Sequence, residues 1–164
     1  MKATSSSLSR IVIACSLILA ALWWTVGPVS PVRAATPIPV SICDQSHLQS
    51  AITQANSDNA GDTITFGCSG DIALTGNLFI TGSMTLDGGN QAVTLDGKET
   101  TQVAFVNGAI NVTFKNLTIA NGNKQQSQGT GGGGIANIDG TVSVINGTLS
   151  NNVGGGGLGG AIYS

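Results

Sequence analysis

NLTIANG, at residues 116–122, decides the fold of this chain because it returns as NGTLSNN at residues 146–152, an offset of 30 positions. A second pair, GGGIAN at 132–137 and GGAIYS at 159–164, returns after 27 positions. Such a unit is too long for a hairpin meander and too short to contain a helix beside its strands. Short apolar strands that repeat between Gly and Asn, with loops of slightly different length, indicate a stacked solenoid.

Two shorter near-duplicates, MTLDG at 84–88 and VTLDG at 93–97, lie nine residues apart and run in the same polarity. Asp-Gly also suits a hairpin turn, but a hairpin partner would follow at once. Parallel stacking explains the repetition better. It would place Asp87 and Asp96 at equivalent positions of neighbouring strands.

The composition favours β-structure with many tight corners. Gly accounts for 24 of 164 residues, apolar residues for 41% and charged residues for 9%. A disordered chain combines low hydrophobicity with high net charge. This composition has neither, so it excludes a disordered protein. The length allows one ordinary domain.

Residues 1–34 have the pattern of a secretory signal peptide. Lys2 and Arg10 precede an apolar run at 11–27, and short side chains occupy the two positions that a signal peptidase reads. We expect cleavage between Ala34 and Ala35 and a secreted or cell-surface location. The alternative is an uncleaved anchor, because the run is near the lower length limit for a membrane span. The membrane is expected as a partner only through this segment.

Removal of residues 1–34 leaves three lysines and eight acidic residues, so 3 − 8 gives a net charge of −5, with no arginine. Nucleic-acid binding requires clustered Lys or Arg to neutralise phosphates. The charge pattern therefore excludes that class of partner.

Two cysteines remain after processing, Cys43 and Cys68. In an oxidising compartment two cysteines usually form a disulfide. From the chain-entropy relation, this bond would stabilise the folded state by roughly 3.5 kcal/mol. The alternative is two unrelated buried thiols.

The rest of the chain divides into three parts. Residues 35–42, with two prolines, read as an extended linker or an edge segment. Residues 43–60 contain an amphipathic helix, which we expect from about His47 to Asn56. Its apolar stripe falls at i, i+3, i+4 and i+7. Ser46 and Gln49 would form a capping box at its start. Residues 61–164 are the repeats.

We therefore predict an all-β right-handed parallel β-helix of about four turns. Asn and Gly would occupy corners that need left-handed or tight backbone. The helix would cover the first turn, whose core and strand edges are otherwise exposed. The C-terminal end is expected to be open or truncated, since the sequence stops inside a repeat.

These segments resemble a known family. Cys43-Asp44, the apolar stripe, the strand GDTITF at 61–66 and Cys68 resemble the N-terminal cap and first strand of secreted bacterial right-handed β-helix proteins of the pectin-lyase-like superfamily. GGAI at 159–162 looks like a motif of polymorphic outer-membrane-protein repeats. The expected FxxN partner motif reads LSNN at 149–152, with the aromatic replaced. The resemblance implies a cell-surface or extracellular protein, often an adhesin.

Catalysis has few candidates. A lyase needs Arg or Lys, often with Ca²⁺, and a hydrolase needs a carboxylate pair. Asp87 and Asp96 are the best pair, but they are better explained as turn formers before Gly, and the sole histidine, His47, as an exposed or capping residue. We predict no catalytic residue, cofactor or metal. The favoured function is a structural or adhesive scaffold that contacts glycans or cell-surface macromolecules. The alternative is the N-terminal part of a carbohydrate-active enzyme, a polysaccharide lyase or glycoside hydrolase, whose catalytic turns lie beyond Ser164.

Overall fold

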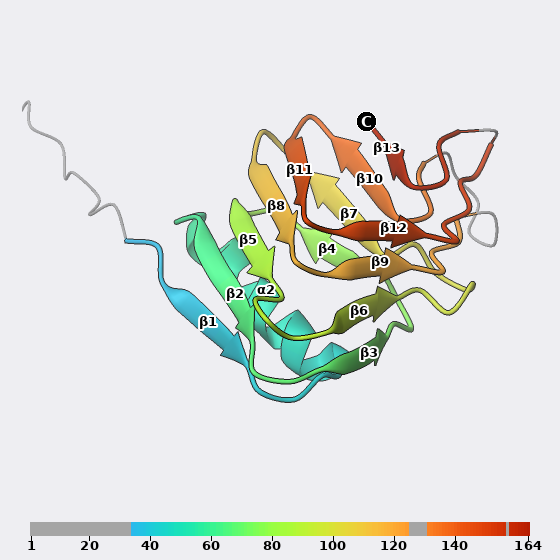
Figure 1. The fold of residues 1–164 in the computed structure, drawn as a ribbon. Coiled ribbons are helices and arrows are strands. Elements are labelled where there is room, and N and C mark those ends of the chain that lie inside the picture. The colour runs from blue at the N-terminus through green and yellow to red at the C-terminus, as the bar shows by residue number, and fades with distance from the viewer. Residues whose placement is uncertain (1–33, 125–130, 157) are drawn as a thin grey trace, which may run out of the picture. The chain divides into compact units, whose positions relative to one another are not determined.

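The computed structural model describes residues 34–124, 131–156 and 158–164, and in these ranges the chain is an all-β parallel solenoid with a single helix (Figure 1). Every pairing between named strands is parallel. The prediction of a parallel stack rather than hairpins is thus confirmed. Residues 1–33, on which the signal-peptide prediction rests, lie outside the described residues.

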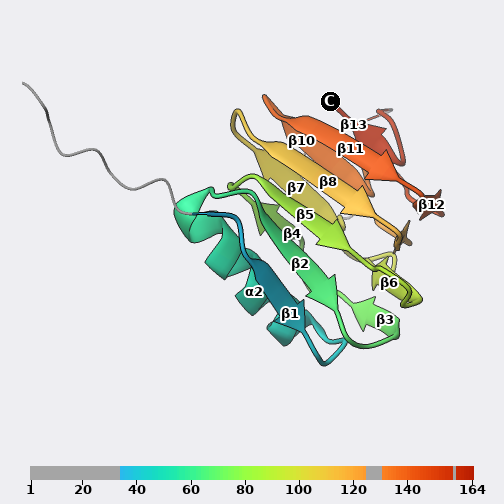
Figure 2. The same cartoon turned by 60° about the vertical axis from the view of Figure 1, so that its left-hand side comes forward.

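The first sheet has five strands, which lie side by side in Figure 2. In sheet order they are β1 (Pro37–Val40), β2 (Asp62–Phe66), β5 (Met84–Asp87), β8 (Asn111–Lys115) and β11 (Thr141–Ile145). The two-proline segment is therefore an edge strand. Its position suits proline, which cannot donate to a neighbouring strand.

Two four-stranded sheets complete the architecture. The second sheet contains β3 (Gly70–Ala73), β6 (Val93–Asp96), β9 (Thr118–Ala120) and β12 (Thr148–Ser150). The third sheet contains β4 (Leu78–Ile80), β7 (Ala104–Asn107), β10 (Ile135–Ile138) and β13 (Ile162–Tyr163). From β2 onward the chain visits the first, second and third sheets in turn, and we call each set of three successive strands a rung.

The register agrees with the sequence repeats. Thr118 of β9 pairs with Thr148 of β12, the 30-residue offset, and Ile135 of β10 pairs with Ile162 of β13, the 27-residue offset. The expectation for the shorter near-duplicates was wrong in one respect. They form β5 and β6, which belong to different sheets and do not pair. A nine-residue step covers only one corner of a rung.

Inward side chains form apolar columns that run across the rungs and meet in one core. One column on the first sheet contains Ile64, Leu86 and Phe114, each fully buried. Burial on this scale is the main favourable contribution to stability in such a fold, at roughly 25 cal/mol per Å² of apolar surface. The apolar residues that alternate along each strand are thus the same residues that repeat between rungs.

Helix α2 (Gln45–Asp58) lies beside β1 and contacts β2 and β4 (Figures 1 and 2). Its predicted apolar stripe is buried in the core and consists of Leu48, Ala51, Ile52 and Ala55. The predicted start was wrong. Asp44, not Ser46, is the N-cap residue and accepts a hydrogen bond from the His47 N–H at 2.8 Å, because a carboxylate at this position satisfies a free helix donor. The helix therefore begins two residues earlier than expected.

Asparagines in left-handed backbone form the corners, as predicted. Asn116 and Asn146 follow β8 and β11 with φ of 54° and 49°, and Asn121 and Asn151 follow β9 and β12 with φ of 52° and 51°. Asparagine tolerates this region better than other residues with a Cβ, because its short polar side chain bonds the local backbone. The same turn chemistry thus recurs in successive rungs.

Candidate functional site

Asp87, one member of the candidate catalytic pair, is part of a corner. Its Oδ1 accepts hydrogen bonds from the Gly89 N–H at 2.8 Å and from Nδ2 of Asn116 in the next rung at 2.7 Å. Its Oδ2 accepts one from Nζ of Lys115 at 2.9 Å. The Lys115 hydrogen bond is the main cause that holds the pKa of Asp87 below its ordinary value. The carboxylate is charged and fully engaged.

Asp96 repeats this arrangement in the second sheet. Its Oδ1 accepts from the Lys98 N–H at 2.8 Å and from Nδ2 of Asn121 at 2.9 Å, and its Oδ2 lies 2.8 Å from Nζ of Lys98. Burial raises the pKa of Asp96, but the hydrogen bonds from Lys98 and Asn121 together outweigh it, so the pKa lies below its ordinary value. The same contact raises the pKa of Lys98.

The structure therefore does not bring the predicted pair together as a catalytic dyad. A dyad for acid–base chemistry needs carboxyls whose environments push their pKa values apart, whereas the pKa values of both Asp87 and Asp96 are lowered by the same kind of corner contact. Each carboxylate connects its own corner to an asparagine in the following rung. These contacts support the interpretation of both residues as turn formers.

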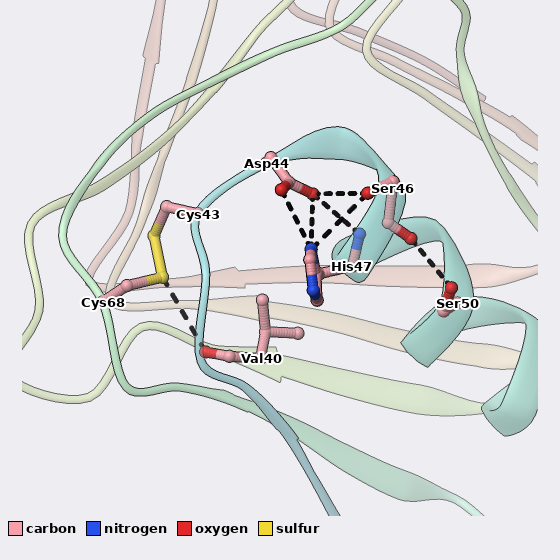
Figure 3. Close-up of polar contacts among 7 residues, drawn as sticks. All are labelled: Val40, Cys43, Asp44, Ser46, His47, Ser50 and Cys68. Atoms are coloured by element: carbon pink, nitrogen blue, oxygen red, sulfur yellow. Dashed lines mark hydrogen bonds and ion pairs between the residues drawn. A yellow bond between two sulfur atoms is a disulfide. The ribbon is translucent and has the colours of Figure 1, made fainter.

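His47 lies in the first turn of α2, where its ring Nδ1 is 2.8 Å and 2.9 Å from the two carboxylate oxygens of Asp44 (Figure 3). Ser46 adds a hydrogen bond to the same carboxylate at 2.8 Å. The His47 N–H, its ring and then Ser46 lower the pKa of Asp44 to about 2. The group is exposed and belongs to the start of the helix, where Asp44 is the N-cap, so His47 has the exposed position that was one of the two roles expected for it.

Cys43 and Cys68 form a disulfide, with a Cα–Cα distance of 5.7 Å (Figure 3). The bond joins the segment before α2 to the segment after β2. The Sγ of Cys68 also lies 3.7 Å from the carbonyl oxygen of Val40, which is a contact only, because a disulfide sulfur has no hydrogen to donate. The other two predicted site residues, Ala34 and Ala35, are exposed and precede β1.

Outward-facing side chains on the sheets line up in polar columns. On the first sheet the column contains Thr63, Thr85, Thr113 and Ser143, paired residue by residue. On the second sheet it contains Asp71, Thr94, Thr118 and Thr148. Parallel strands are spaced about 4.8 Å apart, so each column presents polar groups at that interval. Sequence alternation alone could have indicated which residues face outward, but not that they align.

One groove opens beside the second column, with a volume of about 320 Å³. Its polar lining comes from three successive rungs, at the corner where the first sheet passes into the second. The polar lining residues are Gln91, Thr94, Asn116, Thr118, Asn146 and Thr148. Sequence reasoning missed this site. The 30-residue offset contained the signal for two of its rungs, but the loop at residues 88–92 that supplies Gln91 has no counterpart in the repeats.

Metal binding and membrane crossing can be assessed for residues 34–124, 131–156 and 158–164. In these ranges no three His, Cys, Asp or Glu side chains lie close enough together to hold a metal ion. Their one helix, α2, falls short of the length and apolar character needed to cross a membrane.

Comparison with known proteins identifies no relative: no family model, no curated protein and no solved structure matches the chain.

Proposed function

We propose that the chain is an exported, non-catalytic scaffold that contacts glycans or other macromolecules outside the cell. The observation that carries the proposal is the set of aligned outward columns, two of which present hydroxyl groups across successive rungs. A rigid surface with repeated weak contacts binds a repetitive partner through the sum of those contacts. The fold alone would not indicate function, whereas these surfaces do.

The proposal includes a finer fold assignment. The strands form a right-handed parallel β-helix of about four turns, similar to the pectin-lyase-like superfamily, and right-handed crossovers are the near-universal rule for parallel strands. Helix α2 serves as the cap of the first turn. Its Gln45 accepts hydrogen bonds from the Thr75 N–H and hydroxyl, and its Asn56 accepts from the N–H groups of Thr81 and Gly82.

The engagement of the carboxylates supports a non-catalytic role. Asp87 and Asp96 both have Lys and Asn partners in their corners, and neither pKa is raised as a general acid requires. Location outside the cell is supported by the Cys43–Cys68 disulfide, since such bonds persist in oxidising compartments. The residue pattern of 1–34 supports export.

Two assays on the purified full chain test the proposal. The first measures retention on insoluble polysaccharides and on intact cells, and we expect binding that increases with the number of sites on the surface. The second measures release of reducing ends or unsaturated sugars from polyuronates, and we expect none above the blank. Turnover would overturn the proposal in favour of the alternative, part of a carbohydrate-active enzyme. Absence of retention on every surface would also overturn it.

A further inference from the structure

The groove at the corner between the first and second sheets has a wall that includes Gln91 and Ala92. The loop between β5 and β6 forms this wall. It is fixed by a hydrogen bond from the Gln91 N–H to the Gly88 carbonyl at 2.9 Å and by one from the Ser69 hydroxyl to Gln91 Oε1 at 2.6 Å. Ser69 also accepts from the Ala92 N–H at 3.3 Å. The wall is thus held in place before any ligand arrives, which lowers the entropy cost of binding.

The groove also contains polar groups without protein partners among the described residues. Thr94, Thr118 and Thr148 donate no hydroxyl hydrogen bond there, and neither does the Asn146 amide. By contrast, Thr53, at the exposed surface of α2, donates to a backbone carbonyl at 2.8 Å. Each free hydroxyl offers one donor and two acceptor positions. The three hydroxyls lie in one column at intervals of about 4.8 Å.

Asn116 contributes a fixed acceptor. Its Nδ2 donates to Asp87 at 2.7 Å, and its backbone N–H donates to Ile145 at 3.0 Å, which together hold the residue in left-handed backbone. The side-chain oxygen of Asn116 keeps its acceptor capacity. Gln91 has the opposite arrangement. Its side-chain oxygen accepts from Ser69, while its amide N–H groups remain available. The groove therefore combines preset donors and acceptors with adaptable hydroxyls.

The lining is uncharged, although residues 35–164 carry three lysines and eight acids and so a net charge of −5. Besides its polar side chains the groove includes only Ala92, Val93 and Leu117. The net charge is negative and Lys115, next to the groove residue Asn116, is already paired with Asp87, so a polyanionic ligand such as a polyuronate is disfavoured. A ligand rich in hydroxyl groups but without charge fits both the field and the lining. The volume of 320 Å³ lies at the lower end of ligand pockets, which span about 300–1,000 Å³.

We propose that this groove binds a short neutral oligosaccharide that lies along the stack and contacts three successive rungs. The inference rests on the proposed scaffold function and specifies its partner: an uncharged glycan at the corner between two sheets, rather than an acidic one on a sheet face. The sugar hydroxyls exchange hydrogen bonds with the column at Thr94, Thr118 and Thr148. The wall at Gln91 and the acceptor at Asn116 orient the chain.

The test uses the purified full chain and two probes, neutral β-glucan oligosaccharides and oligogalacturonates of the same length. Backbone amide shifts in NMR titrations report both affinity and position. We expect the neutral probe to bind and to shift residues of all three rungs, at 91–94, 116–118 and 146–148. Absence of neutral binding, preference for the acidic probe, or shifts confined to one rung or to the first sheet would overturn the inference.

Matched substitutions separate the groove from the flat surface. Thr118→Val removes a hydroxyl inside the groove, and Thr113→Val removes one from an equivalent outward position on β8 of the first sheet. We expect about three- to tenfold weaker binding for Thr118→Val, as for loss of one hydrogen bond, and no change for Thr113→Val. Equal effects of the two variants would overturn the inference.

The double variant Thr94→Val/Thr118→Val distinguishes this inference from the scaffold function. We expect it to lose most oligosaccharide binding while its melting temperature changes little, because both positions face outward. If retention on cells or insoluble polymers is unchanged in this variant although the groove no longer binds the oligosaccharide, the scaffold stands and the groove is not its contact site. If oligosaccharide binding itself is unchanged, the inference fails.

Discussion

The two ends of the rung stack are built differently. At the first end, α2 buries Leu48 and Ile52 completely, and the edge strand β1 contains two prolines, which have no N–H to donate to a further strand. At the end formed by β11, β12 and β13, Val142, Val144 and Leu149 are only half-buried. Their register partners one rung back, Val112, Phe114 and Ile119, are at most 1% exposed.

The comparison shows what a rung needs from its neighbours. Leu149 continues the column of Ile119 and Leu95, yet it lacks a layer on its far side among the described residues. Ile162 at the same end is 38% exposed, whereas its register partner Ile135 is fully buried. A solenoid rung buries its apolar side chains only when covered on both faces. In the cap that we propose, helix α2 supplies this cover at the first end, and its hydrogen bonds and the disulfide hold it in place.

The largest expected effect comes from paired leucine truncations at the two ends. Leu48→Ala should lower the free energy of unfolding by about 3–5 kcal/mol, because the site is fully buried and a cavity would remain. Leu149→Ala, a matched change at the other end, should cost about 1 kcal/mol, because much of its surface is already hydrated. Urea unfolding of both variants measures the difference. Equal losses would mean that the ends are covered alike.

Loss of the disulfide should have the next largest effect on stability. The variant Cys43→Ser/Cys68→Ser should be less stable by about 3.5 kcal/mol, because the unfolded chain regains the freedom of an open loop. Thermal unfolding with and without a reducing agent measures this effect. Reduction should leave the double variant unchanged, because it has no bond to break. A wild-type chain insensitive to reduction would contradict the stabilising role given to this bond.

The hydrogen bonds of Asn56 should contribute less. This residue accepts from the Thr81 and Gly82 N–H groups and donates to the Phe79 carbonyl at 3.0 Å, so it joins α2 to β4 and to the segment that follows β4. Asn56→Ala leaves these groups unpaired and should cost about 1–3 kcal/mol in urea unfolding. Gln54→Ala, at an exposed position of the same helix, is the control and should be neutral. Identical behaviour of the two variants would remove the argument for a helix joined by hydrogen bonds.

The smallest effect concerns acid. Asp44, Asp87 and Asp96 have pKa values below the ordinary 3.8, so their stabilising contribution is complete above that pH and is lost as the pH falls through the folded-state values. We expect melting temperatures that are level at neutral pH and decrease below about pH 4.

Asp96→Asn should be destabilising at pH 7, and its difference from the wild type should shrink as the pH falls, because protonation removes the same charge from the wild type. Asp139→Asn, at an exposed carboxylate with no ion pair among the described residues, is the control. A difference for Asp96→Asn that stays constant with pH would contradict the role given to its charge.

Much of the fold could be predicted because two independent signals coincide in it. The offsets of 30 and 27 residues define which strands pair, and the apolar stripe at Leu48 and Ile52 defines the buried face of the helix. The start of the helix was missed because Asp44 and Ser46 are both good N-caps, and only the geometry of the preceding turn selects the carboxylate.

The groove was less predictable than the fold. Its column at Thr118 and Thr148 follows from the repeat, but Thr94 joins it only because β6 is one rung earlier in the same sheet, a pairing that the nine-residue near-duplicate obscured. Gln91 belongs to a loop that occurs once in the chain. Local sequence patterns describe a residue's own strand, whereas the groove depends on which loops the stack brings to one corner.

The most direct test of the central claim, parallel rungs in register, is NMR measurement of scalar couplings across backbone hydrogen bonds. We expect couplings from the Asn116 N–H to the Ile145 carbonyl and from the Thr148 N–H to the Leu117 carbonyl, which are separated by 3.0 Å and 3.1 Å. Couplings that instead join β8 to β9, or that follow an antiparallel order between β8 and β11, would contradict it.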